Sequence, residues 1–223
     1  MKKFILAGVS AVALSTAASA ATFSYSGGVA GFIPGAGEAN DVLAAWGYGG
    51  ASGEFGANVS VVGGPATVKV AYMGFEAGFV NTFRFNGAEI FSTEGAGDPD
   101  NNNKEYSVDE FTPLASMDFA GLMGLLDFEF TGDSGATSVK NGANVVNGPG
   151  SAVNFFVSGN ATTAFLFFDD NGAGDDDNHD DFVIRLSLDD NPAGPNPIPL
   201  PGAGLLLLGA LGGLGLAKRR KKA

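Results

Sequence analysis

Short stretches in which apolar and polar side chains alternate recur through the middle of the chain and predict β-strands. The alternation is clearest in residues 68–72, 82–86, 127–130 and 182–188. Because successive side chains of a strand point to opposite faces, each stretch would turn one apolar face toward a core. Residues 153–157 and 165–168 are apolar almost throughout, which is typical of central strands.

Glycine, asparagine and proline separate these stretches and predict turns. The turn signals are Gly63-Gly64-Pro65, Asn86-Gly87, Asn141-Gly142 and Asn147-Gly148-Pro149. Asn86-Gly87 lies between two apolar runs and predicts a two-residue hairpin. Residues 114–126 are apolar enough for a short helix, although Gly121 and Gly124 weaken a helix. The whole pattern predicts an all-β domain over residues 21–190, an antiparallel β-sandwich or jelly roll.

Charge is distributed unevenly along the chain. All 24 acidic residues lie between residues 38 and 190, where only five of the 12 basic residues occur. Such a surface repels nucleic acid and anionic lipid, so we expect no nucleic-acid partner, and it attracts divalent cations. Solubility is the alternative reason for the same charge. There is no cysteine, which excludes disulfides and thiolate metal sites.

The first 20 residues have the layout of a signal peptide. Lys2 and Lys3 form a basic start, residues 4–14 form a short apolar run, and Ala18-Ser19-Ala20 supplies small residues for signal peptidase. We therefore expect signal peptidase to cut after Ala20 and the rest of the chain to be exported. The alternative is an N-terminal membrane anchor, which the shortness of the apolar run disfavours.

The other end of the chain combines prolines, an apolar segment and a basic cluster. Residues 191–197 form a proline-rich stalk, residues 203–217 an expected apolar transmembrane helix, and residues 218–222 an uninterrupted basic run. A helix from residue 201 to 217 would span roughly 25 Å, barely the thickness of a bilayer core. The basic run would stay in the cytoplasm, which places the domain on the periplasmic side of the inner membrane.

The stretch Ile198, Pro199, Leu200, Pro201 and Gly202, followed by the apolar segment and the basic cluster, resembles the VPLPA variant of the PEP-CTERM sorting signals. It departs from that motif at Ile198, where valine is usual, and at Gly202, where alanine is usual. The resemblance implies processing by an exosortase, a membrane-embedded cysteine transpeptidase, in a Gram-negative bacterium. The domain would then move from the inner membrane to the cell surface or extracellular matrix, where exopolysaccharide is an expected neighbour. The alternative is a tail anchor that stays uncut.

An acidic loop joins two of the predicted strands. Residues 169–181 contain seven carboxylates and no Lys or Arg. Crowded carboxylates repel one another unless a cation lies among them, and oxygen ligands on a glycine-containing loop suit Ca²⁺. The candidate metal ligands are Asp169, Asn171, Asp175, Asp177, Asp180 and Asp181. The spacing departs from an EF-hand at Ala173, which leaves two interpretations open: a calcium-stabilised loop and a solvated acidic turn that protects a sheet edge.

The sequence contains no convincing catalytic site. His179 is the only histidine, and in a loop of carboxylates we expect it to be exposed to solvent. Gly132-Asp133-Ser134-Gly135 is superficially similar to the nucleophile loop of trypsin-like proteases, but the histidine follows the serine instead of preceding it. Glu89 and Glu94 would suit a glycosidase only if the fold brought them to a suitable separation.

These observations predict a non-enzymatic structural or adhesive protein of the cell surface or extracellular matrix, with calcium as its expected ion. The first alternative is a carbohydrate-binding module, for which Trp46, Tyr48 and Tyr106 are the candidate exposed aromatic residues. The second alternative is a secreted hydrolase, which would need two carboxylates that converge in a cleft.

Overall fold

The computed structural model describes residues 20–35, 38–93, 103–132, 137–145, 153–170 and 178–189. All of them belong to one compact unit, Ala20–Gly194. The signal peptide, the stalk, the sorting motif at residues 198–202 and the apolar segment at 203–217 were expected from the sequence and lie outside the described residues. Among the described residues, no helix has the length and apolarity needed to cross a membrane.

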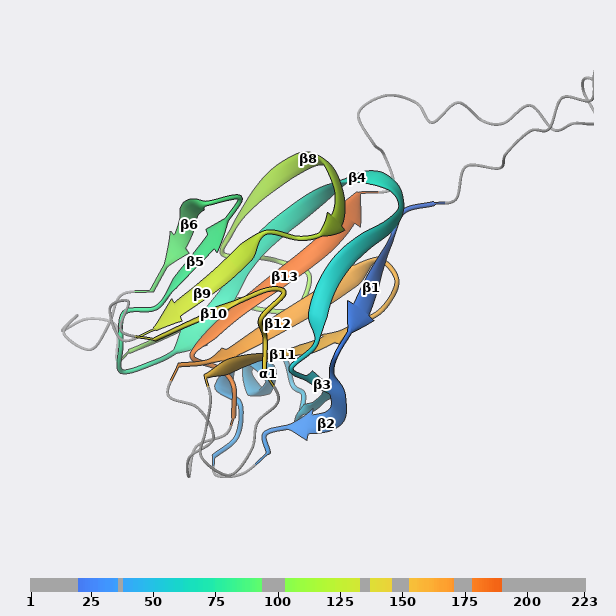
Figure 1. The fold of residues 1–223 in the computed structure, drawn as a ribbon. Helices are drawn as coiled ribbons and strands as arrows, with labels where there is room; N and C mark the ends of the chain where they lie inside the picture. The colour runs from blue at the N-terminus through green and yellow to red at the C-terminus, as the bar shows by residue number, and fades with distance from the viewer. Residues whose placement is uncertain are drawn as a thin grey trace, which may run out of the picture. The chain divides into compact units, whose positions relative to one another are not determined.

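Two antiparallel sheets and one short helix make up the fold (Figure 1). The nine-stranded sheet has the order β1-β4-β13-β12-β11-β3-β2, and β7 and β8 also pair with β4. Its strands are β1 (Thr22–Ser26), β2 (Val29–Ile33), β3 (Ala51–Phe55), β4 (Asn58–Glu76), β7 (Lys104–Tyr106), β8 (Ala115–Leu125), β11 (Asn154–Gly159), β12 (Thr163–Asp169) and β13 (Phe182–Asp189). The four-stranded sheet, in the order β10-β9-β5-β6, contains β5 (Thr82–Phe85), β6 (Ala88–Ser92), β9 (Phe128–Gly132) and β10 (Thr137–Lys140). The helix is α1 (Asp41–Ala45).

Phenylalanine side chains fill the space between the two sheets. Phe83 and Phe130 from the small sheet and Phe155 and Phe168 from the large sheet are fully buried there. The rings of Phe130 and Phe168 stack with centroids 4.8 Å apart. Two antiparallel sheets packed through such a layer are the arrangement of a β-sandwich, so the all-β prediction is confirmed at this level.

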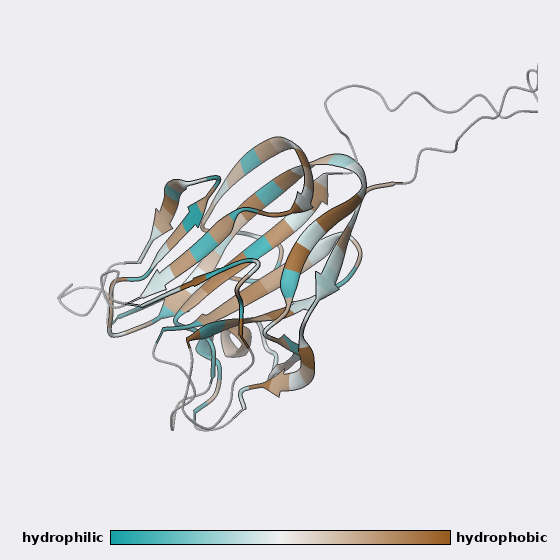
Figure 2. Cartoon of the chain, in the orientation of Figure 1, coloured by the Kyte–Doolittle hydropathy of each residue, from teal (hydrophilic) through white to brown (hydrophobic). Residues whose placement is uncertain are grey.

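The opposite face of the large sheet carries a second, smaller core. α1 contributes Val42 and Leu43, and the sheet contributes Met73, Phe156 and Phe167. Phe167 and Phe168 are neighbours on β12 but point to opposite faces, as the period-2 alternation of a strand requires. β12 and β13 are therefore buried on both faces around Phe167 and Val183, which explains why their sequences are rich in apolar residues there (Figure 2).

The alternating stretches predict the central strands correctly. Residues 68–72, 82–86, 127–130, 153–157, 165–168 and 182–188 fall almost entirely within β4, β5, β9, β11, β12 and β13. The Asn86-Gly87 hairpin is also confirmed. Both residues have positive φ, 50° and 78°, and they join β5 to β6. Asparagine and glycine tolerate this left-handed region, so the local sequence alone specifies the turn.

Two local predictions are wrong. Residues 114–126 form strand β8 and no helix, because the segment pairs with β4 over most of its length and its Gly121 and Gly124 adopt positive φ. The expected turn at residues 63–65 lies inside the long strand β4. There the register between β4 and β8 shifts between Val61 and Ala66, so the glycines and proline mark an irregularity in a strand and no chain reversal.

Asn141 ties the end of the small sheet to the large sheet and provides a test of this arrangement. Its side chain is 3% exposed, accepts a hydrogen bond from Val59 N at 2.8 Å and donates to Val59 O and Leu126 O. We expect Asn141→Ala to lower the free energy of unfolding by about 1–2 kcal/mol, because it leaves buried backbone groups without partners. Urea unfolding measures this loss, and Asn160→Ala, at an exposed turn, is the control that should lose less. An equal loss in both variants would contradict the bridging role of Asn141.

Candidate functional site

The two ends of the acidic loop lie at one edge of the large sheet. Asp169 ends β12 and Asp170 follows it, while Asp180 and Asp181 precede β13. Residues 171–177 lie outside the described part of the chain, and with them the predicted ligands Asn171, Asp175 and Asp177. Antiparallel pairing of β12 with β13, which sets Phe168 opposite Phe182, brings the two acidic ends together.

Three carboxylates from distant parts of the chain converge at this edge. Asp41 in the first turn of α1, Glu76 at the end of β4, and Asp180 each place one oxygen within 4.8 Å of the other two. Asp180 is 1% exposed, whereas Asp41 and Glu76 are half-buried. We call these three residues the acidic cluster. Its oxygens are spaced closely enough to be shared by one cation.

Backbone contacts hold the acidic cluster in place. The Glu76 amide donates to Asp180 O at 2.8 Å, and the Asp41 amide donates to Asp180 Oδ2 at 2.6 Å. Asn40 is the N-cap of α1, because its Oδ1 accepts from Leu43 N at 2.8 Å. Its Nδ2 also donates to Asn178 O at 2.8 Å. The start of α1 is thereby fixed to the end of the acidic loop.

Lys104 and Tyr106 of β7 supply the positive and donor groups that face the acidic cluster. Lys104 Nζ lies 2.9 Å from Asp41 Oδ2 and 3.1 Å from Glu76 Oε1. The Tyr106 hydroxyl donates to Asp41 Oδ2 at 2.8 Å. A lysine ammonium is a compact point charge. The Lys104 ammonium therefore lies where a metal ion bound by the same two carboxylates would lie.

The pKa shifts in the acidic cluster show how its carboxylates share charge. The pKa of Asp41 falls to about 2, first because of its hydrogen bond with the Glu76 carboxyl, with Lys104 and Tyr106 adding to the effect and burial opposing it. Burial, followed by the same hydrogen bond, raises the pKa of Glu76. Asp41 therefore carries the negative charge in preference to Glu76, and Glu76 binds a proton more readily than a free glutamate does.

A second group of carboxylates lies next to the acidic cluster. Asp181 Oδ2 accepts from the Asp170 amide at 2.7 Å, and Asp170 Oδ2 accepts from Asn81 Nδ2 at 2.7 Å. Burial, and then the charges of Asp170, Asp169 and Asp180, raise the pKa of Asp181 well above its usual value. Asn81 is fully buried, and its Oδ1 has no hydrogen-bond donor among the described residues. Such an oxygen is free to accept from an ordered water or to ligate a cation.

The expectation that His179 is exposed is wrong. Its side chain is fully buried, with Nε2 2.8 Å from Asn154 Oδ1 and its ring edge-on to Phe55 at a centroid distance of 5.4 Å. Its φ of 58° is in the left-handed region. The residue therefore turns the chain sharply before β13 and points its ring inward. The acidic composition of its neighbours in the sequence does not predict its exposure to solvent.

The structure divides the predicted metal ligands and adds two others. Asp180 belongs to the acidic cluster, while Asp169 and Asp181 lie in the adjoining group. Asp41 and Glu76 are new, since their positions in the sequence do not indicate that they meet Asp180. The only local signal is the run Asn40-Asp41, which is typical of a helix N-terminus.

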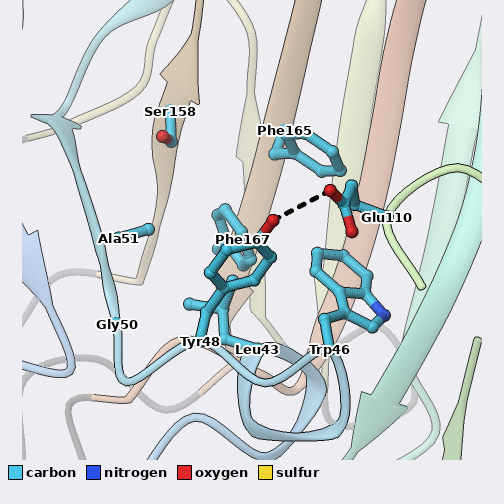
Figure 3. A pocket seen from close by; sticks show the side chains of 9 residues that line it. All are labelled: Leu43, Trp46, Tyr48, Gly50, Ala51, Glu110, Ser158, Phe165 and Phe167. Atoms are coloured by element: carbon cyan, nitrogen blue, oxygen red, sulfur yellow. Dashed lines mark hydrogen bonds between the residues drawn. The ribbon is translucent and has the colours of Figure 1, made fainter. Parts of the chain in front are cut away.

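The three aromatic residues proposed for carbohydrate binding separate into two locations. Trp46 and Tyr48 line a cavity of ≈ 270 Å³, shown in Figure 3, together with Phe165 and Phe167. Tyr106 instead belongs to the surroundings of the acidic cluster. Of the proposed glycosidase pair, Glu89 lies in β6 and Glu94 lies outside the described residues.

Comparison with protein-family models, with curated proteins and with solved structures gives no match to this chain. The features that bear on function are therefore the acidic cluster, the cavity and the sequence patterns at the two ends. Among these, the acidic cluster has the most specific geometry, because its carboxylates and hydrogen bonds join three separate segments of the chain.

Proposed function

We propose that this chain is an exported, calcium-stabilised structural or adhesive module of the cell surface or extracellular matrix. The observation that carries the proposal is the convergence of Asp41, Glu76 and Asp180 at the base of the acidic loop. A cation there would connect α1, β4 and the segment before β13 in one step. The cation would therefore stabilise the folded domain and would have no catalytic role.

The donor set favours calcium over other metals. Every donor of the acidic cluster is a carboxylate oxygen, and Ca²⁺ takes 6–8 oxygens in flexible geometry. Mg²⁺ prefers fewer carboxylates and retains water, while zinc and copper sites usually contain histidine or cysteine. The single histidine is engaged with Asn154, and the chain has no cysteine. Further oxygens would come from the acidic loop, where Asn171, Asp175 and Asp177 are the candidates.

The two ends of the chain supply the cellular part of the proposal. Signal peptidase would remove residues 1–20, and the inner membrane would hold the chain through residues 203–217 until an exosortase acts at residues 198–202. The domain would then remain at the surface or enter the matrix, among exopolysaccharide. The excess of acidic residues fits this setting, since divalent cations then become bridges between acidic groups.

Thermal unfolding of the purified protein, in chelator and in added calcium, tests the proposal. We expect calcium to raise the midpoint, because an ion that binds only the folded state stabilises it by about 1.4 kcal/mol when free calcium is tenfold above its Kd. Asp180→Asn should lose most of this rise, while Asp118→Asn on the exposed strand β8 should keep it. An unchanged midpoint in the parent protein would leave the acidic loop as a solvated turn and end the calcium assignment.

A further inference from the structure

Two adjoining cavities form a groove on the face of the large sheet opposite the four-stranded sheet. They measure ≈ 270 Å³ and ≈ 420 Å³ and share Glu110 and Phe165 as lining residues. Small-molecule sites typically occupy ~300–1,000 Å³. The groove is therefore large enough for a ligand of more than one ring and too small for a folded partner.

The pairing register explains how the sequence builds the floor of this groove. Antiparallel pairing sets Thr163 opposite Ser187 and Phe165 opposite Arg185. Residues two apart on a strand share a face, so these four side chains point to the same side of the sheet. The floor thus alternates one aromatic ring with hydroxyl and guanidinium groups. Phe167 extends the aromatic surface beneath the smaller cavity.

Aromatic side chains form the walls of the groove and its opening. The rings of Trp46 and Phe165, both drawn in Figure 3, lie 5.6 Å apart. The Trp46 indole N–H donates to Ser107 Oγ, which fixes the ring. Tyr48 and Phe111 are 47% and 74% exposed. Large aromatic surfaces that face water beside a cavity indicate a binding surface, because a ligand that covers them removes apolar area from water.

The polar groups of the groove are placed to form hydrogen bonds with a ligand. The Tyr48 hydroxyl donates to Glu110 Oε1 at 2.8 Å in an exposed position (Figure 3). Arg185 donates through Nη1 to the Glu110 carbonyl, while its Nε is buried with no hydrogen-bond partner among the described residues. A buried charged donor without a partner is costly, and a small shift of the Arg185 side chain toward a ligand oxygen in the groove would satisfy it. Asn160 and Ser187 add further donors and acceptors to the lining.

These features together select the chemistry of the ligand. A purely apolar ligand would leave Arg185 Nε without a partner and would cover the Tyr48–Glu110 hydrogen bond without adding one to it. An anionic ligand would meet the carboxylate of Glu110, which lines both cavities, on a strongly acidic chain. A neutral saccharide avoids both penalties, because each sugar ring has an apolar face to lie against aromatic rings and hydroxyl groups around its edge.

We propose that this groove binds a neutral saccharide, with Tyr48 and Trp46 as the aromatic platform and Arg185 and Glu110 as hydrogen-bonding groups. The inference deepens the adhesive part of the proposed function by naming the class of ligand. The saccharide inference rests on the proposed function only for the place where the protein would meet saccharides, the cell surface or extracellular matrix. None of the groove residues belongs to the acidic cluster, so the groove can be tested without calcium.

Trp46 is the single tryptophan and reports directly on the groove. The experiment titrates the purified protein in chelator with neutral trisaccharides of glucose, galactose, mannose and N-acetylglucosamine, and with a galacturonic acid trisaccharide. We expect at least one neutral trisaccharide to change Trp46 fluorescence saturably in the millimolar range and the acidic one to have no effect. Equilibrium dialysis with the same sugars provides a measurement independent of fluorescence.

Matched variants locate the binding. Tyr48→Ala should weaken binding by about tenfold or more, since it removes an aromatic platform and the partner of Glu110. Phe79→Ala is the control, because Phe79 is 43% exposed and does not line either cavity. The proposal is overturned if no neutral trisaccharide binds, if only the acidic one binds, or if the two variants lose affinity equally. Because chelator is present throughout, failure of the calcium proposal would leave these outcomes unaffected.

Discussion

Replacing Asp181 by asparagine should stabilise the calcium-free protein at neutral pH and weaken the dependence of its stability on pH. Asp181 is half-buried, and desolvation together with the charges of Asp170, Asp169 and Asp180 raises its pKa well above the usual value. Asparagine keeps an oxygen that can accept from the Asp170 amide, so the local hydrogen bond is retained. The substitution therefore removes an unfavourable buried charge without removing a contact.

The direction of the pH effect follows from the raised pKa. Between the unfolded pKa near 3.8 and the raised folded pKa, the folded protein binds more protons than the unfolded chain, so stability falls as pH rises. Glu76, whose pKa is also raised, acts in the same direction above its usual 4.5. Asp41 acts in the opposite direction, but only below 3.8, because its pKa is lowered to about 2. In chelator we therefore expect the midpoint to fall as the pH rises above about 4.

Thermal midpoints measured in chelator across this pH range provide the test. Asp181→Asn should flatten the fall and raise the midpoint at neutral pH, and each kcal/mol gained corresponds to roughly 2–4 °C in a domain of this size. Each pKa unit corresponds to about 1.4 kcal/mol, so the gain measures the upward shift directly. Asp118→Asn, an exposed carboxylate on β8, should leave the profile unchanged. A lower midpoint for Asp181→Asn at neutral pH would show that the charged form is the stable one.

The strands were predictable because their signal is local. In residues 182–188 the alternation of Phe182, Ile184, Leu186 and Leu188 with other side chains specifies one face of β13 without knowledge of the rest of the fold. The hairpin at Asn86-Gly87 was predictable for the same reason, since its two residues determine its backbone angles. By contrast, residues 114–126 became a strand because β4 supplied a partner, and tertiary pairing overrode local propensity.

The acidic cluster was only partly predictable because its members come from distant segments. The density of carboxylates in residues 169–181 directed attention to Asp180, which lies in the acidic cluster. Asp41 and Glu76 reach it only through the docking of α1 and the pairing of β4 with β13, which no local pattern encodes. His179 shows the converse, because a residue with acidic neighbours in the sequence is buried against Phe55 in space.

α1 connects the acidic cluster to the groove. Asp41 at its start belongs to the acidic cluster, Leu43 lines the groove, and Trp46 caps its end. A helix this short has little stability of its own, so its position depends on the contacts at its two ends. A cation held by Asp41 would add one contact at the start of α1, where hydrogen bonds of Asn40 and Asp180 already hold the helix, and Trp46 at its end is held independently by Ser107.

Lys104→Met should make the domain depend on calcium more strongly than the parent protein does. The Lys104 ammonium lies within 2.9 Å of Asp41 and 3.1 Å of Glu76, and it balances charge that a divalent cation would balance instead. Removing it leaves half-buried carboxylates without a counter-ion. An exposed ion pair contributes about 0–1 kcal/mol, and loss of one partner from a buried pair costs about 3–5 kcal/mol. Because these three side chains are 34–38% exposed, we expect a loss of about 1–2 kcal/mol in chelator.

Calcium should reverse most of this loss, because without the ammonium all three carboxylates of the acidic cluster are available to the ion. The calcium-induced rise in the unfolding midpoint should then be larger for Lys104→Met than for the parent protein. Lys140→Met is the matched control. Lys140 forms an exposed ion pair with Asp127 at 2.9 Å, and neither residue belongs to the acidic cluster, so this variant should show a small loss that calcium leaves unchanged. If Lys104→Met lost the same free energy in chelator and in calcium, Lys104 would be a structural partner of Asp41 and Glu76 alone, and the ion would have to bind elsewhere. A larger calcium response confined to Lys104→Met would instead identify the ammonium as the group that calcium displaces.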